Sequence, residues 1–220
     1  MITTVQKDCF SVQFITHCND RYTYLQSAEM ALRGHCKWIQ LRMKNSSKDE
    51  RRQMAQRVQE LCKHYQAVFI VDDDVDLCME IKADGVHLGK NDMPIEQART
   101  LLGEKYIIGA TCNQYEDIER AKKNGADYIG LGPFRYTLTK VNLNPILGIE
   151  GYQTIIQQCK SQQINLPIVA IGGITENDIE ILWKTKINSI AISGEVLNAD
   201  HPIQKMINIV QKINRVQNFV

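Results

Sequence analysis

The chain has 220 residues, of which 44% are apolar and 23% charged, and its formal net charge is +1. The length fits one domain, residues 1–220, of α/β-barrel size, and the composition is typical of a soluble globular protein. A net charge so close to zero provides no field for nucleic acid or an acidic membrane surface, and no run of about 18 apolar residues predicts a membrane span. We therefore expect neither nucleic acid nor membrane as a partner, while a homo-oligomer stays open.

The seven cysteines indicate a reducing environment. Their number is odd, and no two of them form a C-x-x-C motif. Residues 1–16 also lack an apolar stretch long enough for a signal peptide. Reduced thiols in a cytoplasmic protein account for this pattern better than a disulfide framework or a zinc site does.

Short apolar runs alternate with amphipathic segments along the chain. Most of the runs are continuously apolar, which is typical of parallel strands buried on both faces. In chain order they predict strands at residues 12–16, 38–42, 68–71, 85–88, 107–110, 128–131, 168–171 and 189–192. Start and stop signals predict helices at residues 22–32, 51–65 (after a capping-box pattern at 47–50), 75–81, about 94–103, 176–183 and 203–216.

Eight strand-then-helix units in a chain of this length predict a TIM (β/α)8 barrel. A doubly wound open sheet is the alternative, but such sheets normally use fewer strands. In a barrel, functional groups gather at the C-terminal ends of the strands and in the following loops. The sequence places these polar, charged and glycine residues there: Gln40, Arg42, Lys44, Asp72, Asp73, Asp74, Lys90, Asn91, Asp92, Thr111, Asn113, Thr137, Thr139, Lys140, Gly172, Gly173, Ser193 and Gly194.

Carboxylates concentrate after the third and fourth strands, which are neighbours in a barrel. Adjacent acidic oxygens favour a hard cation such as Mg²⁺, which keeps several waters and takes further ligands from phosphate. Each carboxylate alone has a simpler explanation. Asp92 can cap a helix that starts near Met93, and Asp74 and Asp76 can form a solvated helix start.

Two glycine-containing loops predict a second anion site. Gly172-Gly173 follows the seventh strand and Ser193-Gly194 the eighth, where many barrels bind phosphate through backbone N–H groups. The layout suggests a metal-assisted diphosphate near strands two to four and a single phosphate near strands seven and eight. Positive charge for these anions would come from Arg42, Lys44 and Lys140. The simpler interpretation of these three residues is ordinary surface charge.

The histidines contribute little to this picture. His87 stands in an alternating strand segment and is predicted to be a packed core residue rather than a catalyst, while His17 can reach the barrel mouth. The sequence contains no Ser-His-Asp order, no P-loop and no G-x-G-x-x-G that opens a helix.

Several stretches together resemble the thiamine phosphate synthase family. The combination of Gln-x-Arg-x-Lys with Gly-Pro-x-x-x-Thr-x-Thr-Lys is the specific part. The resembling stretches are residues 40–44, 71–77, 83–89 with Asp92, 107–109, 125–140 and 168–174. The resemblance implies a Mg²⁺-dependent TIM-barrel transferase that joins hydroxymethylpyrimidine diphosphate to thiazole phosphate, releasing pyrophosphate and giving thiamine phosphate.

The resemblance also implies roles for single residues. Gln40, Arg42 and Lys44 would hold the pyrimidine diphosphate, and Asp73 and Asp92 would hold Mg²⁺. Thr111 falls at the family's serine that touches the pyrimidine substrate. Lys140 would contact pyrophosphate, and the thiazole phosphate would be bound by Thr137, Thr139, Gly173, Ile192 and Ser193. The expected catalytic residues are Lys140, Arg42 and Thr111.

The implied mechanism is dissociative. Pyrophosphate leaves the pyrimidine methylene, the ring delocalises the resulting cation, and the thiazole nitrogen attacks. That nitrogen has a free lone pair, so the reaction needs no strong general base.

Two departures from the family pattern leave alternatives open. Asp72 stands where the family usually has Asn, and an ionised Asp only accepts hydrogen bonds. It would accept from the pyrimidine amino group, join the metal shell, or mark a different site. Asn113 stands where the family has His, which the related thiazole tautomerase uses. The alternatives are therefore a tautomerase-like relative, disfavoured by Asn113 and Lys140, and a thiamine-pathway phosphate-binding barrel without turnover.

Overall fold

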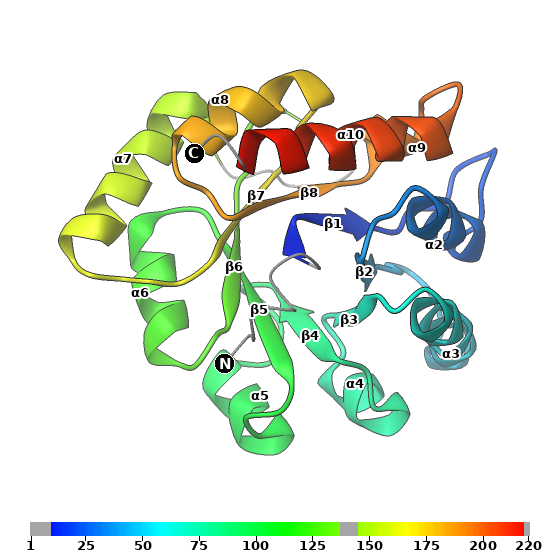
Figure 1. Ribbon diagram of the computed structural model, residues 1–220. Helices are drawn as coiled ribbons and strands as arrows, with labels where there is room; N and C mark the ends of the chain where they lie inside the picture. The colour runs from blue at the N-terminus through cyan, green and yellow to red at the C-terminus, as the bar shows by residue number, and fades with distance from the viewer. Residues whose placement is uncertain (1–9, 137–144, 218–220) are drawn as a thin grey trace.

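The computed structural model describes residues 10–136 and 145–217 of the chain. They form a closed barrel of parallel strands that runs in order from β1 to β8, with helices around the outside (Figure 1). The predicted TIM barrel is confirmed, and the open sheet is wrong because β1 pairs with both β2 and β8. None of the helices in the described ranges combines the length and the apolar character needed to cross a membrane.

All eight predicted strands are present, with small shifts at their ends. The first two end one residue earlier than predicted, β3 ends one residue later and β5 two residues later. Asp72 and Thr111 therefore lie within strands, and not after them as predicted. The strands are β1 (Val12–Ile15), β2 (Trp38–Leu41), β3 (Val68–Asp72), β4 (Gly85–Leu88), β5 (Ile107–Cys112), β6 (Tyr128–Leu131), β7 (Ile168–Ile171) and β8 (Ser189–Ile192).

The predicted helices also occur, and the structure adds α6, α7 and the short α9 to them. The helix predicted at 176–183 divides into a 3-10 turn, η2, and α8. The helices are α2 (Tyr24–Arg33), α3 (Lys48–His64), α4 (Val75–Ile81), α5 (Ile95–Leu102), α6 (Tyr115–Lys123), α7 (Gly148–Ser161), η2 (Glu176–Asp178), α8 (Ile179–Lys184), α9 (Gly194–Leu197) and α10 (Pro202–Gln217).

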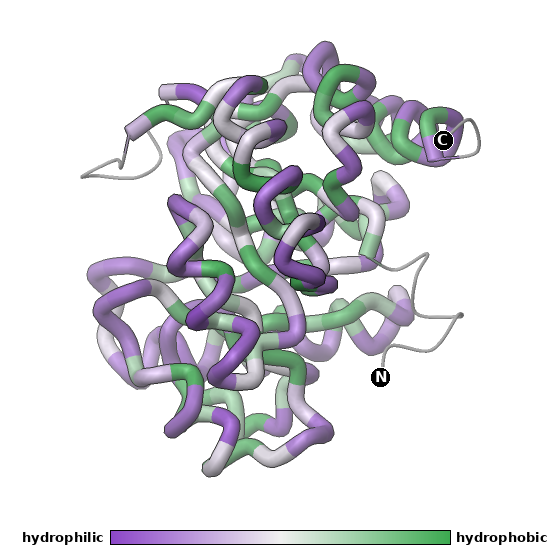
Figure 2. Tube along the Cα trace, turned by 90° about the vertical axis from the view of Figure 1, so that its left-hand side faces the viewer, coloured by the Kyte–Doolittle hydropathy of each residue, from purple (hydrophilic) through white to green (hydrophobic). Residues whose placement is uncertain are grey.

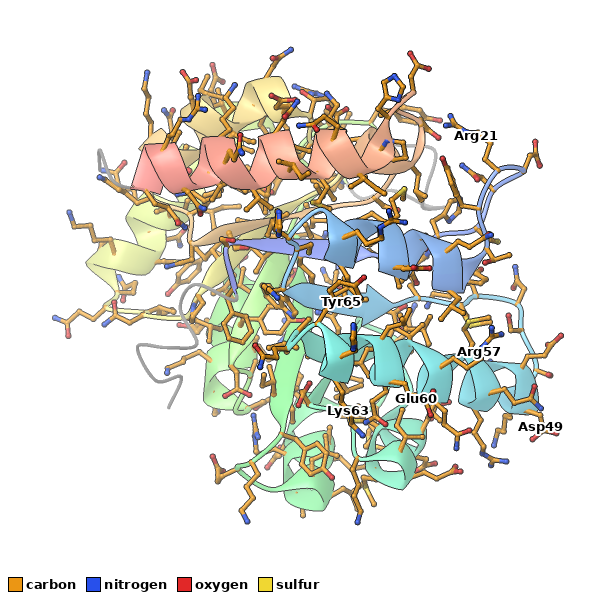
Figure 3. All side chains as sticks on the ribbon, turned by 45° about the vertical axis from the view of Figure 1, so that its right-hand side comes forward. Arg21, Asp49, Arg57, Glu60, Lys63 and Tyr65 are labelled. Carbon is orange, nitrogen blue, oxygen red and sulfur yellow. The ribbon has the colours of Figure 1, made fainter. Side chains whose placement is uncertain are left out.

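Helix α3 illustrates how the sequence fixes an outer element. Its capping box is present, with Ser47 Oγ accepting from the backbone N–H of Glu50, so the helix starts at residue 48, three residues earlier than predicted. Its charged side chains, labelled in Figure 3 at Arg57, Glu60 and Lys63, point away from the barrel. The opposite face is buried against the strands, as the periodicity of an amphipathic helix requires.

The strands carry apolar side chains on both faces. One buried layer fills the space between the strands and the helices. A second, smaller cluster fills the barrel interior and contains Trp38 and Tyr128, whose rings pack edge to face at 4.9 Å. Figure 2 shows the same division, with polar segments concentrated on the outer helices and apolar ones within. The closed interior leaves the ends of the barrel as the place for function.

Candidate functional site

Two cavities open where the strands end. The first, here called the large cavity, has a volume of about 530 Å³ and lies mainly over β5 to β8. The second, the acidic cavity, has a volume of about 340 Å³ and is lined mainly by the last residue of β3 and by residues that follow β2 and β3. The sequence-predicted residues that line the large cavity are Arg42, Thr111, Asn113, Gly172, Gly173, Ile192, Ser193 and Gly194. Those that line the acidic cavity are Lys44, Asp72, Asp73 and Asp74.

The polar residues of β2 and its loop converge on Asp72. Gln40 Nε2 donates to Asp72 Oδ1 at 2.6 Å. Arg42 Nε and Lys44 Nζ lie 3.6 and 3.7 Å from Asp72 Oδ2, and Lys44 also pairs with Asp73. Burial and the neighbouring Asp73 raise the pKa of Asp72 to about 7, against the opposing effect of the two cations. One oxygen of Asp72 thus faces the Gln40 amide on β2, and the other faces the two cations of the loop that follows β2.

Asp73 and Asp92 form a carboxylate pair. Their side chains are hydrogen-bonded to each other, and Asp92 Oδ2 accepts from the backbone N–H of Gly89 at 2.6 Å. Burial and then the contact with Asp73 raise the pKa of Asp92. Burial alone would raise the pKa of Asp73, but the Lys44 ammonium and the hydrogen bond to Asp92 outweigh it and lower that pKa.

This pair is chemically suited to a divalent cation. Two carboxylates in contact repel each other when both are charged, a dication would relieve that repulsion, and oxygen is the ligand that Mg²⁺ prefers. Within residues 10–136 and 145–217, no group of three or more His, Cys, Asp or Glu is arranged to hold a metal. Water and phosphate oxygens are suited to be further ligands, because Mg²⁺ usually keeps several waters and binds substrate phosphates.

The helix-capping explanation holds for one carboxylate and fails for the other. Asp74 Oδ1 accepts from the N–H of Leu77 at 2.9 Å and caps α4. Asp92 does not cap α5, because Pro94 occupies the N-cap position of that helix. Lys90 is engaged elsewhere, in an ion pair of 2.6 Å with Asp117.

The loops after β7 and β8 border the large cavity with backbone. Gly172 and Gly173 have φ values of 99° and 66°, which favour glycine. A Cβ at Gly173 would lie 2.4 Å from Arg135 Cγ and 2.8 Å from the carbonyl oxygen of Tyr136. Ser193 contributes a buried hydroxyl that has no hydrogen-bond partner within the described part of the chain.

The ends of the loop after β6 are held close together. The N–H groups of Leu147 and Gly148 donate to the carbonyl oxygens of Pro133 and Phe134 at 2.9 and 3.0 Å. These paired ends, here called the stem, are joined to the loop after β7, because the backbone N–H of Arg135 donates to the carbonyl oxygen of Gly172 at 3.0 Å.

An ion pair reinforces the same junction. Arg135 Nη1 and Nη2 donate to the two carboxylate oxygens of Asp178 at 2.6 and 2.7 Å. This bidentate hydrogen bond, partly opposed by burial, raises the pKa of Arg135. The predicted residues Thr137, Thr139 and Lys140 lie outside the described residues.

The wall of the large cavity also contains His87, which the sequence did not identify as functional. His87 is buried, as predicted, but it also lines this cavity, and its Nε2 lies 3.1 Å from Thr111 Oγ1. Asn113 donates to the carbonyl oxygen of Gly132, while its Oδ1 is buried without a partner among the described residues. His17 is not among the described residues that line either cavity.

The chain is similar to proteins of known family and structure. The family model for thiamine monophosphate synthase matches residues 12–196. Over 192 residues the chain is 55% identical to the thiamine-phosphate synthase of Bacteroides thetaiotaomicron, covering 87% of this chain and 92% of that protein. Over 203 residues it is 45% identical to the thiamine-phosphate synthase of Flavobacterium johnsoniae, covering 92% and 94%. The solved thiamine phosphate pyrophosphorylase from Pyrococcus furiosus matches with a TM-score of 0.83 at 31% identity, covering 96% and 98% of the two chains.

Proposed function

Because the chain belongs to the thiamine monophosphate synthase family, we propose that it joins hydroxymethylpyrimidine diphosphate to thiazole phosphate, giving thiamine phosphate and pyrophosphate. The observation that carries this proposal is the position of Arg42 between the two cavities. Arg42 lines the large cavity, and its Nε lies 3.6 Å from Asp72, which lines the acidic cavity. A diphosphate bound beside Arg42 would leave its organic part directed toward the large cavity, where a second substrate has room.

The residues of β2 and its loop would bind the diphosphate. Arg42 can grip phosphate oxygens with its planar fork, and Lys44 adds a point charge. In the absence of substrate, Asp72 holds both cations and orients Gln40 through the 2.6 Å hydrogen bond. The arrangement supports a role for Asp72 as the residue that preorganises this subsite.

Asp73 and Asp92 would hold Mg²⁺, together with diphosphate oxygens and water. When bound, the ion would neutralise charge that accumulates on the departing pyrophosphate. The two carboxylates would fix the position of the diphosphate relative to Arg42. Lys44, which pairs with Asp73, would exchange that partner for the phosphate oxygens.

The thiazole phosphate would occupy the loops after β7 and β8. Gly173, Ile192 and Ser193 line the large cavity there, and the unpartnered Ser193 hydroxyl is available to a phosphate oxygen. Thr137 and Thr139 would complete this subsite from the loop after β6. The substrate nitrogen would then face the methylene carbon. Such alignment of two reactants can lower the activation barrier of their reaction by up to about 7–11 kcal/mol.

The protein would act by stabilising the leaving group, with Arg42, Lys140 and Thr111 as catalytic residues. No general base is required, because the attacking nitrogen carries a free lone pair. Asn113 supports this reading over a tautomerase, since a carboxamide side chain does not exchange a proton as imidazole does. Its amide is also committed to the carbonyl oxygen of Gly132.

An assay of pyrophosphate release tests the function directly. We expect release only when both substrates and Mg²⁺ are present, with thiamine phosphate formed in equal amount. Binding of the substrates without release would favour a phosphate-binding barrel that lacks turnover. Isomerisation of a thiazole carboxylate phosphate without pyrophosphate release would favour the tautomerase.

Replacement of Lys140 tests the leaving-group role. We expect Lys140→Ala to lower turnover about 100-fold or more, because a positioned charge on a developing anion contributes roughly 3–4 kcal/mol. The measurement is the steady-state rate at saturating substrates, with circular dichroism to check the fold. A near-normal rate would remove Lys140 from the proposed mechanism.

A further inference from the structure

The proposed mechanism uses Thr111 but not the buried polar side chains behind it. Thr111 Oγ1 lies 3.1 Å from His87 Nε2, and His87 Nδ1 lies 3.0 Å from the Tyr128 hydroxyl. Gln13 Nε2 lies 3.2 Å from the same hydroxyl. These four side chains come from β5, β4, β6 and β1. They form a hydrogen-bonded row inside the barrel, here called the polar row, that ends at the large cavity.

The polar row is enclosed by the barrel. Gln13, Tyr128 and His87 are 2%, 3% and 8% exposed, so their donors depend on protein partners. Gly109 pairs in register with both His87 and Tyr128. A Cβ at Gly109 would lie 2.4 Å from the Tyr128 hydroxyl oxygen and 2.5 Å from His87 Nδ1. A glycine at this position therefore leaves the room in which the Tyr128–His87 hydrogen bond forms.

The donors and acceptors give the polar row a direction. The Gln13 amide nitrogen can only donate, so the Tyr128 oxygen accepts from it. The Tyr128 hydroxyl hydrogen then needs an acceptor of its own. Across the described residues, the acceptor in hydrogen-bond contact with it is His87 Nδ1. Leaving that buried hydrogen without an acceptor would lower stability, because its hydrogen bond to water would be lost without a replacement.

The direction continues to Thr111. If His87 Nδ1 accepts, the neutral imidazole carries its hydrogen on Nε2 and donates it to Thr111 Oγ1. The Thr111 hydroxyl, already an acceptor on this side, has its own hydrogen free to point elsewhere. Because Thr111 lines the large cavity, that hydrogen is available to a bound molecule.

We propose that Gln13, Tyr128 and His87 are positioning residues that hold the Thr111 hydroxyl as a hydrogen-bond donor to an acceptor atom of the bound pyrimidine diphosphate. The identity of that ligand rests on the proposed function, whereas the direction of the polar row does not. A threonine hydroxyl without this support can rotate, so its hydrogen would have no fixed direction. The polar row removes that freedom before the substrate arrives.

The opposite direction has a distinct chemical signature. With the Gln13 amide reversed, Tyr128 would donate to the Gln13 oxygen, and His87 would carry its hydrogen on Nδ1. Thr111 would then donate to His87 Nε2 and offer the substrate no hydrogen. The two directions therefore differ in the tautomer of one imidazole.

Nitrogen NMR of the folded, ligand-free protein distinguishes them. The protein is labelled with ¹⁵N-histidine, and His87→Gln identifies the signals of His87 by their loss. We expect an unprotonated Nδ1 and a protonated Nε2. A protonated Nδ1 with an unprotonated Nε2 would overturn the proposal. Because this measurement needs no turnover, its outcome is separate from that of the pyrophosphate assay.

A matched pair of variants tests the consequence for the reaction. His87→Gln places an amide nitrogen near the position of Nε2 and can still donate to Thr111, whereas His87→Asn places it near Nδ1 and cannot. We expect kcat/KM to fall about tenfold in His87→Asn, as for one lost hydrogen bond, and less in His87→Gln. Circular dichroism checks that both fold. Equal losses in the two folded variants, or a smaller loss in His87→Asn, would overturn the positioning role.

Discussion

The aspartates at the ends of the third and fourth strands differ only in what surrounds them. Asp74 caps a helix, Asp72 faces three polar side chains of β2 and its loop, and Asp73 contacts Asp92. The sequence predicts an acidic cluster because the ends of neighbouring strands meet at one edge of the barrel. It does not predict which carboxylate takes which partner, because that depends on side-chain rotamers and on the turn that carries Asp92.

Removal of one member of the carboxylate pair tests the metal proposal. We expect Asp92→Asn to raise the Mg²⁺ concentration needed for half-maximal pyrophosphate release by about tenfold or more, because an amide supplies a neutral oxygen in place of a charged one. The rate is measured over a Mg²⁺ titration. The exposed Asp49, labelled in Figure 3, provides the control Asp49→Asn, which should keep the wild-type curve. Equal curves for all three proteins would contradict a metal site at Asp92.

His87 shows a limit of residue-level prediction. Alternation along β4 correctly predicts that His87 is a packed, buried residue. Its contacts with Thr111 and Tyr128 depend on the register of β4, β5 and β6, which brings His87 opposite Gly109 and Thr111 opposite Gly130. That register follows from closure of the whole barrel, so no local pattern contains it.

At the scale of elements, apolar runs predicted every strand because parallel barrel strands are buried on both faces. The predicted strand ends were less accurate where a polar residue continues a strand, as Asp72 and Thr111 do. The glycine pair after β7 was correctly placed beside the loop after β8, since the two strands are neighbours. The contact of Gly173 with Arg135 lay beyond prediction, because it depends on the path of the loop after β6.

Gly173 offers a test of the proposed thiazole-phosphate subsite. We expect Gly173→Ala to raise KM for thiazole phosphate about tenfold, because a Cβ there would displace backbone at Tyr136 as well as Arg135, at a cost of roughly 1–3 kcal/mol. KM for the pyrimidine diphosphate should change less. Steady-state kinetics with each substrate varied in turn gives both values.

Gly103 provides a matched control for that variant. It also has a positive φ, of 72°, but no atom lies within 4 Å of a Cβ built on it. Gly103→Ala should therefore lower stability through backbone strain while leaving both KM values near wild type. If Gly103→Ala raised KM for thiazole phosphate as much as Gly173→Ala does, the rise could not be caused by contact of the new Cβ with the cavity wall.

For the whole molecule, barrel closure buries several polar groups. Among them, Asp72 has the clearest effect on how stability depends on pH. Its pKa is raised from the ordinary value of 3.8 to about 7, first by burial and then by Asp73. A carboxyl with a raised folded-state pKa holds its proton more tightly in the folded protein. Its contribution to stability is therefore complete below about pH 3.8 and is lost as the pH rises through about 7.

The variant Asp72→Asn tests this linkage. Since an amide has no proton to lose, we expect the free energy of unfolding of the wild type to fall relative to that of Asp72→Asn between about pH 4 and pH 7. Urea unfolding at a series of pH values, without Mg²⁺, measures the difference. A constant difference across that range would show that Asp72 titrates normally in the folded protein.

The stem of the loop after β6 bears on how such a protein can diversify. The backbone hydrogen bonds at Leu147 and Gly148 return the chain to the point it left at Pro133 and Phe134. A loop that begins and ends at one place can be replaced without changing the spacing or the pairing of β6 and β7. A relative's loop, grafted at these positions, would bring its own contacts to an unaltered barrel. If the loop binds substrate as proposed, selection would act on substrate choice here separately from folding.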